Sequence, residues 1–330
     1  MNQTKPTIYS RRQFLRDGTA ATLAGAAAAL LASRETLAQS ETPSQADVHY
    51  SGTHLTAPTR FIEVDGDKFA YRRWGNASSG QPPLLFVQHF RGGMDHWDPL
   101  LTDGLATDRE VILYNGRGIA SSTGTPRNRI EDMADDIALV VQALGVSQVD
   151  LLGFSIGGLQ VQEVALRHPR QVRKLILLGT GLRGGDPRME PKVLEVAQRP
   201  VPTAEDMAYL FFGRSQAAKQ AALAFWERRH QRVDQDPPSS AEVAKAQAEA
   251  YVAYLPPPPG ANPYAYLNAM TQPTLVLNGV NDIMIPTINS WHLSQNIPNA
   301  QLLIYPDAGH GAQFQYPERF LKHANQFLEE

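Results

Sequence analysis

Ser155 lies in the sequence GFSIGG, with a glycine two residues before it and another two residues after it. An apolar β-rich run (148–154) precedes the serine and a helical pattern follows it. A serine in such a sharp strand-to-helix turn presents its hydroxyl beyond the end of the strand. Glycines at 153 and 157 remove side chains that would collide with neighbouring backbone. The pattern predicts a nucleophile rather than a turn serine.

A serine nucleophile needs a base, and the base needs a group that orients it. Asp282, in NGVNDIMIP, and His310, in DAGHGAQ, each follow a later β-rich run. The chain order serine, aspartate, histidine is that of one known arrangement of the catalytic triad. Asp186, which follows an earlier run, is the competing candidate for the acid. We favour Asp282 because its run comes directly before that of His310.

Composition narrows the possible functions. The chain has 330 residues, a net charge of -3 and no cysteine. The charge gives no reason to expect nucleic-acid binding. The absence of cysteine excludes disulfides, a cysteine nucleophile and thiolate metal sites.

Two further patterns could indicate ligand sites. The residues His89, Asp95, His96 and Asp98 fit no zinc spacing, so we expect no metal. The sequence GTGLRG (179–184) matches a nucleotide-binding fingerprint, but no amphipathic helix follows it. We therefore expect no bound dinucleotide.

The elements that position these residues form an alternating pattern. A hairpin is predicted around Asp65-Gly66, and short apolar runs are predicted as strands at 83–89, 109–115, 148–154, 174–180, 273–279 and 301–307. Helical patterns separate most of them, including 130–144 and 157–168. Alternating strands and helices predict an α/β fold with a doubly wound, mostly parallel sheet. Residues 183–270 contain helical patterns and no convincing strand. We predict a helical cap there, inserted into a core formed by 59–182 and 271–330.

These motifs resemble the α/β-hydrolase superfamily, in its serine-nucleophile branch with a helical cap. GFSIGG, NGVNDIMIP and DAGHGAQ resemble the nucleophile elbow, acid loop and histidine loop of that family, and NGRGIASS (115–122) resembles a loop segment in which Asn115 and Ala120 depart from the usual residues. The resemblance implies Ser155, Asp282 and His310 as the triad.

VQHFRGGMDHWDP (87–99) resembles the oxyanion loop of the family, with Phe90 where glycine is common. The resemblance implies backbone N–H groups of Phe90 and Ile156 as the oxyanion hole. Arg91 and Trp97 are candidates to line the substrate pocket, with a surface arginine and a packed tryptophan as the alternatives.

The resemblance implies hydrolysis of a small-molecule carboxylic ester or lactone through an acyl-enzyme, without a cofactor. Two alternatives stay open. Related enzymes use the same triad as cofactor-free haloperoxidases or perhydrolases, and a protein of this fold can also be a catalytically silent binding protein.

The first residues resemble a twin-arginine export signal. SRRQFL (10–15) precedes an apolar stretch (18–33), and Ala38 stands at a plausible cleavage point. The stretch is too short and too rich in alanine for a convincing membrane span. We expect a signal peptide at 1–38, a flexible linker at 39–58, the twin-arginine machinery as a partner, and a periplasmic or extracellular location.

Overall fold

The computed structural model describes residues 51–199 and 201–330, and all structural statements concern these residues. The predicted signal peptide (1–38) and the first part of the predicted linker (39–50) lie outside them. None of the helices in the described ranges combines the length and apolar character needed to span a bilayer.

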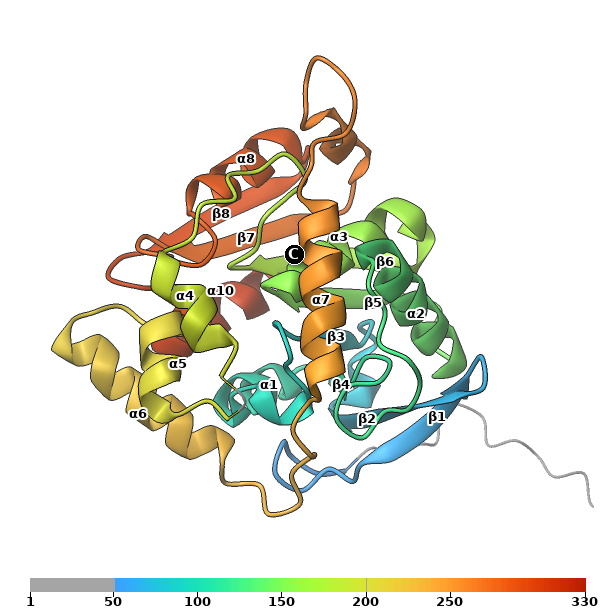
Figure 1. The fold of residues 1–330 in the computed structure, drawn as a ribbon. Helices are drawn as coiled ribbons and strands as arrows, with labels where there is room; N and C mark the ends of the chain where they lie inside the picture. Colours follow the sequence, from blue (N-terminus) through green and yellow to red (C-terminus); the bar gives the residue numbers. More distant parts are fainter. Residues whose placement is uncertain (1–50, 200) are drawn as a thin grey trace, which may run out of the picture. The chain divides into compact units, whose positions relative to one another are not determined.

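The core is an eight-stranded sheet in the order β1-β2-β4-β3-β5-β6-β7-β8 (Figure 1). Only β2 is antiparallel to its neighbours, β1 and β4, and the remaining pairs are parallel. The strands are β1 (Arg60–Val64), β2 (Asp67–Gly75), β3 (Leu84–Val87), β4 (Glu110–Tyr114), β5 (Val149–Phe154), β6 (Val172–Leu178), β7 (Thr274–Gly279) and β8 (Ala300–Tyr305). The predicted hairpin and all six predicted parallel strands are therefore present.

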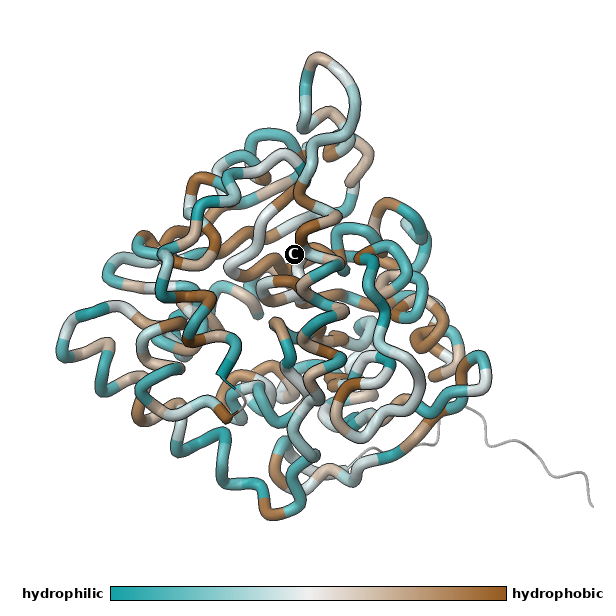
Figure 2. Tube along the Cα trace, in the orientation of Figure 1, coloured by the Kyte–Doolittle hydropathy of each residue, from teal (hydrophilic) through white to brown (hydrophobic). Residues whose placement is uncertain are grey.

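The central strands are apolar throughout because helices cover both of their faces. In β3, Leu84 and Phe86 belong to one hydrophobic cluster, whereas Leu85 and Val87 belong to another. Successive side chains of a strand point to opposite faces, so each strand contributes to both clusters. Figure 2 shows hydrophobic positions concentrated along these strands. The doubly wound α/β fold is confirmed.

Among the helices outside 183–270, three contribute to each cluster. Residues of α1, α9 and α10 join the cluster around Phe86, together with residues of the helical segment 183–270, and residues of α2, α3 and α8 join the cluster around Val87. The helices outside 183–270 are α1 (Pro99–Ala106), α2 (Ile130–Ala143), α3 (Ile156–Arg167), α8 (Ile288–Asn296), α9 (Ala312–Gln315) and α10 (Pro317–Glu329).

The chain between β6 and β7 is helical. Its helices are α4 (Pro191–Ala197), α5 (Ala204–Phe211), α6 (Gln216–Arg229) and α7 (Ala241–Tyr254). Three of them begin at a hydroxyl residue whose side chain accepts a hydrogen bond from the first helical turn: Thr203, Ser215 and Ser240. The described residues of 183–270 contain no strand.

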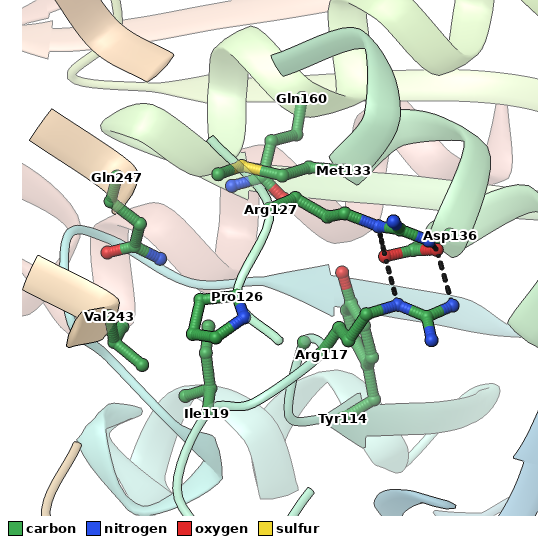
Figure 3. Close-up of a pocket in the computed structure, with 11 residues that line it drawn as sticks. Tyr114, Arg117, Ile119, Pro126, Arg127, Met133, Asp136, Gln160, Val243 and Gln247 are labelled. Carbon is green, nitrogen blue, oxygen red and sulfur yellow. Dashed lines mark hydrogen bonds and ion pairs between the residues drawn. The ribbon is translucent and has the colours of Figure 1, made fainter. Parts of the chain in front are cut away.

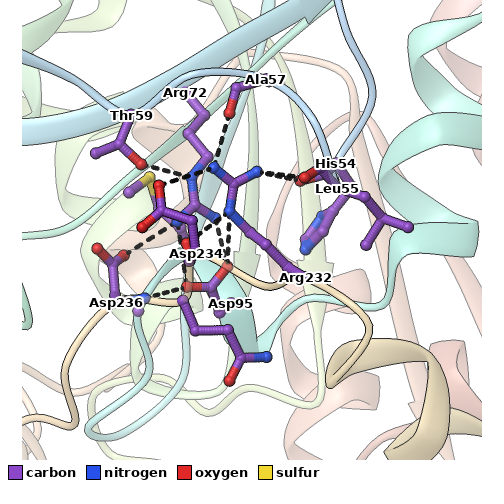
Figure 4. Close-up of polar contacts among 12 residues, drawn as sticks. His54, Leu55, Ala57, Thr59, Arg72, Asp95, Arg232, Asp234 and Asp236 are labelled. Carbon is purple, nitrogen blue, oxygen red and sulfur yellow. Dashed lines mark hydrogen bonds and ion pairs between the residues drawn. The ribbon is translucent and has the colours of Figure 1, made fainter.

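Residues 51–58, expected as the end of a flexible linker, instead pack against the core. Arg232, which follows α6, donates hydrogen bonds to the carbonyls of His54 (3.0 Å), Leu55 (2.9 Å) and Ala57 (3.0 Å), as Figure 4 shows. The same network contains the buried ion pair between Arg72 and Asp95. The polar character of residues 51–58 could not predict this packing, because their partner Arg232 is far away in the sequence.

His54 makes the stability of the protein sensitive to acid. Its ring is buried, its Nδ1 lies 2.9 Å from Thr102 Oγ1, and burial lowers its pKa from 6.5 to about 3. Below pH 6.5 the unfolded chain therefore binds a proton at His54 that the folded chain does not bind. This difference lowers the free energy of unfolding by about 1.4 kcal/mol for each pH unit until about pH 3.

Between pH 7 and pH 4.5, we expect the free energy of unfolding of a His54→Asn variant to fall by about 3 kcal/mol less than that of the wild type. Urea unfolding of both proteins at the two pH values measures this difference. An equal loss in the two proteins would show that His54 is charged in the folded state.

Candidate active site

The turn between β5 and α3 holds Ser155 in an unusual backbone conformation, with φ 58° and ψ −123°. Left-handed φ values are strained for residues other than glycine and persist only where the surroundings enforce them. Two hydrogen bonds do so here. Ser155 N–H donates to the carbonyl of Leu178 (2.9 Å), and the hydroxyl of Thr180 donates to the carbonyl of Ser155 (2.7 Å).

The glycines around Ser155 are required by close backbone contacts. A Cβ atom at Gly153 would lie 2.5 Å from the carbonyl oxygen of Gly157, and one at Gly157 would lie 2.3 Å from that of Val87. A Cβ at Gly158 would lie 2.5 Å from Thr180 Cβ. Real Cβ atoms do not approach other atoms this closely, so the elbow needs glycine at these positions.

His310 and Asp282 form a buried pair beyond the ends of β8 and β7. His310 Nδ1 lies 2.8 Å from Asp282 Oδ2, and both side chains are fully buried. Asp282 Oδ1 accepts the backbone N–H groups of Met284 (2.8 Å) and Ile285 (2.9 Å). These bonds fix the carboxylate, which in turn fixes the ring. Asp186, the competing acid, pairs with the exposed Arg188 instead (2.5 Å).

The second ring nitrogen of His310 is available for chemistry. Because a carboxylate only accepts hydrogen bonds, Nδ1 carries the proton in the neutral ring and Nε2 carries a lone pair. Nε2 is buried and makes no hydrogen bond within the described part of the chain. The ring lies against Phe154, the neighbour of Ser155, with a centroid distance of 4.9 Å. A hydrogen bond between a nucleophile and its base is often formed only once substrate is bound.

The loop after β3 carries the other predicted site residues. His89 Nδ1 lies 2.8 Å from the carbonyl of Phe90, so Nδ1 donates this bond. Gln247 of α7 accepts the N–H of Arg91 through Oε1 (2.6 Å), and Arg91 has a left-handed φ of 62°. Burial lowers the pKa of His89 to about 3, which keeps this ring neutral. A hydrogen bond within the loop and another from α7 thus hold the loop in place.

Ser155 and Phe90 lie where two cavities adjoin. The larger, of about 300 Å³, is mostly apolar and is lined by residues that include Ile156, Val193, Leu194, Tyr251 and Met284. The smaller, of about 90 Å³, is lined by residues that include His89, Arg91, His96 and Phe211. The two predicted oxyanion residues, Phe90 and Ile156, therefore lie on cavity walls beside Ser155.

The two predicted pocket residues have different surroundings. Arg91 lines the smaller cavity, and its Nη1 donates to the carbonyl of Arg199 (2.9 Å). Trp97 does not line either cavity. It is 1% exposed and packs against the rings of Phe86 (5.1 Å) and Phe314 (6.1 Å). The structure therefore corrects the substrate-contact prediction for Trp97 to the alternative of a packed core residue.

The acidic residues near the two histidines have structural partners. Asp95 pairs with Arg72, and Asp98 accepts the N–H of Leu100 at the start of α1 and pairs with Arg228 (2.6 Å). Within the described ranges, no group of three or more histidine, aspartate or glutamate side chains could hold a metal ion.

A separate pocket beside α2 is too small for an organic substrate. Its volume is about 30 Å³, enough for water, and Figure 3 shows Arg117 and Arg127 both bound to Asp136 on its wall.

Asn115, one of the departures noted in the sequence, accepts the N–H of Met94 through Oδ1 (2.8 Å). This segment therefore supports the loop after β3.

Apart from Ser155, Phe90 and Ile156, the sequence pattern does not single out the residues that line the larger cavity, such as Tyr251 and Met284. It also does not single out Gln247, which binds the loop after β3. Gln247 and Tyr251 lie on α7, whose pattern predicts only a helix. Met284 lies within the acid motif NGVNDIMIP, two residues after Asp282, and that proximity is the one signal that could have indicated it.

Known proteins were compared with this chain. A family model for the alpha/beta hydrolase fold matches residues 82–317. The chain is 33% identical over 199 residues to a 2-hydroxymuconate semialdehyde hydrolase from Pseudomonas putida, covering 58% of this chain and 66% of that protein.

Two solved structures are also similar. An alpha/beta hydrolase fold protein from Chitinophaga pinensis is 35% identical with a TM-score of 0.77, and the match covers 84% of this chain and 100% of that chain. An N-acyl homoserine lactone degrading enzyme is 25% identical with a TM-score of 0.64, and the match covers 81% of this chain and 100% of that chain.

Proposed function

This chain belongs to the alpha/beta hydrolase fold family, and from that premise we propose that it is a serine hydrolase that cleaves a carboxylic ester or lactone. One observation carries the proposal. Ser155 stands on a strained elbow at the junction of two cavities, and the buried His310–Asp282 pair lies against the residue next to it.

In the acylation step, His310 Nε2 takes the proton of the Ser155 hydroxyl as its oxygen attacks the carbonyl carbon. Asp282 holds the proton on Nδ1 and stabilises the positive ring that forms. The N–H groups of Phe90 and Ile156 are proposed to stabilise the oxyanion. Ile156 is the first residue of α3, where a helix has unpaired N–H groups and the positive end of its dipole.

The ring then returns its proton to the leaving oxygen, and the carbon–oxygen bond of the ester breaks. Water, deprotonated by the same nitrogen, attacks the acyl-enzyme and releases the acid. In a lactone, the leaving oxygen stays attached to the acyl group, so one product results.

The cavities favour a substrate with one large apolar group. A dry cavity of about 150 Å³ is known to hold benzene. The larger cavity here, of about 300 Å³, therefore has room for a group about twice the size of benzene. We propose that an acyl group of medium length occupies it.

Labelling with a fluorophosphonate probe tests the proposal. We expect a covalent adduct on the peptide that contains Ser155, and hydrolysis of p-nitrophenyl esters with an optimum at medium acyl length. Folded protein without an adduct would instead favour the catalytically silent binding protein. Faster peracid formation from acetate and peroxide than ester hydrolysis would favour the perhydrolase alternative.

A second candidate is hydrolysis of 2-hydroxymuconate semialdehyde. It is favoured by the similarity to the protein named 2-hydroxymuconate semialdehyde hydrolase. Assaying that semialdehyde beside the ester and lactone panel distinguishes the two candidates, because the preferred substrate has the higher kcat/KM.

We also propose export by the twin-arginine route, on the basis of SRRQFL at 10–15 and the apolar stretch that follows. N-terminal sequencing of the protein from the periplasm or medium should find a mature chain that begins at Gln39. Recovery of the intact chain from the cytoplasm alone would contradict this proposal.

A further inference from the structure

Helix α7 crosses the carboxyl ends of β3 and β5 (Figure 1) and is fixed to the core at two points. Gln247 binds the backbone of Arg91, as described above. About two turns further on, the hydroxyl of Tyr254 donates to Glu163 Oε1 (3.0 Å), and the guanidinium of Arg183 stacks 4.4 Å above the Tyr254 ring. The helix between these contacts is therefore held in place beside the active site.

Tyr251 lies between the two fixed points. It stands four residues after Gln247 and three before Tyr254, a spacing that places all three on one side of the helix. Tyr251 packs against the small hydrophobic cluster that includes Ile156 and Leu159. Phe90 packs against the same cluster. The Tyr251 side chain thus lines the same cavity as both proposed oxyanion residues.

Tyr251 also brings a polar group to an apolar cavity. The larger cavity is lined chiefly by apolar side chains, such as Val193, Leu194, Val252, Met284 and Ile285. The Tyr251 hydroxyl makes no hydrogen bond to any of the described residues. Burial together with the charge of Asp282 raises the pKa of Tyr251 to about 12, so the hydroxyl keeps its proton at neutral pH.

We propose that the Tyr251 hydroxyl determines specificity by donating a hydrogen bond to a second oxygen of the substrate. This inference rests on the proposed ester or lactone hydrolysis and names its substrate class: acyl groups that carry a neutral keto, amide or ether oxygen besides the reacting carbonyl. The negative charge of Asp282, which is felt at Tyr251, disfavours a carboxylate in the same place.

A plain hydrocarbon chain fits this cavity less well. When it fills the space, it displaces water from the hydroxyl and offers no acceptor in return, and a buried polar group without a partner is costly. An acyl group with an oxygen near the hydroxyl avoids this cost. Between acyl groups of similar length, the cavity therefore discriminates by a lost hydrogen bond.

Matched pairs of esters test the proposal. The first pair is p-nitrophenyl pentanoate and 4-oxopentanoate, and the second is p-nitrophenyl hexanoate and 5-oxohexanoate. We expect the wild type to prefer at least one keto ester over its plain partner in kcat/KM, and Tyr251→Phe to reduce that preference by about 3- to 10-fold, the usual worth of one neutral hydrogen bond.

Tyr209→Phe is the matched control, because it removes a tyrosine hydroxyl that already has a partner, Glu190, and Tyr209 lines neither cavity. It should leave the ratio of keto to plain ester unchanged. A structural role of Tyr251 would lower kcat/KM equally for both esters of a pair, and that result overturns the inference.

An unchanged ratio in Tyr251→Phe also overturns it, and so does a wild type without any keto preference. In these cases the wild type still hydrolyses esters and reacts with the fluorophosphonate, so the proposed function stands. Absence of both hydrolysis and labelling in the wild type would instead refute the proposed function, and this inference with it.

Discussion

A Ser155→Ala variant is expected to hydrolyse esters at least about 10⁴-fold more slowly than the wild type, because it removes the oxygen that attacks the carbonyl. Water would have to attack directly, helped only by binding and by the oxyanion donors. Hydrolysis of p-nitrophenyl esters, measured at enzyme concentrations high enough to detect the residual rate, checks the expected loss.

The variant should fold normally. The hydrogen bonds that hold the elbow use the backbone N–H and carbonyl of Ser155, and alanine retains both groups. Circular dichroism and thermal unfolding verify this. Ser290→Ala is the control, because Ser290 is a fully buried serine outside both cavities and its loss should leave activity unchanged. A Ser155→Ala protein with more than about a tenth of the wild-type rate would place the nucleophile elsewhere.

The elbow, acid and histidine loops could be predicted because local signals specify each of them. Glycine at Gly153 is required by a contact under 3 Å within the turn itself, and glycine at Gly157 by one with the end of β3. The runs before Asp282 and His310 are buried strands, which an apolar pattern indicates reliably. Because β7 and β8 are adjacent and parallel, their carboxyl ends bring the two residues together.

Side chains in irregular segments were harder to place. Trp97 follows a short 3-10 turn, Met94–His96, and nothing in its neighbours' polarity shows that it points into the core. Tyr251 and Gln247 belong to a helix whose position over the sheet depends on contacts of its last residue, Tyr254, with Glu163 and Arg183, which are distant in sequence. Periodicity predicts the helix but not the partner that it packs against.

An Asp282→Asn variant is expected to lose about 10³- to 10⁴-fold in kcat/KM while His310 keeps its position. Asparagine fits the same space, and its oxygen can still accept the N–H groups of Met284 and Ile285. Its NH₂ group then faces His310 Nδ1 and donates to it. The imidazole proton moves to Nε2, and the ring has no lone pair left to take the serine proton.

Asp186→Asn is the matched control, because Asp186 follows the neighbouring strand and was the competing acid. Its partner is the exposed Arg188, and exposed ion pairs contribute little to stability, so the rate and the thermal stability should stay close to those of the wild type. Measuring kcat/KM for both variants on one ester separates the two assignments. If Asp186→Asn lost activity and Asp282→Asn kept it, the 2.8 Å contact between His310 and Asp282 would be structural and Asp186 would be the acid.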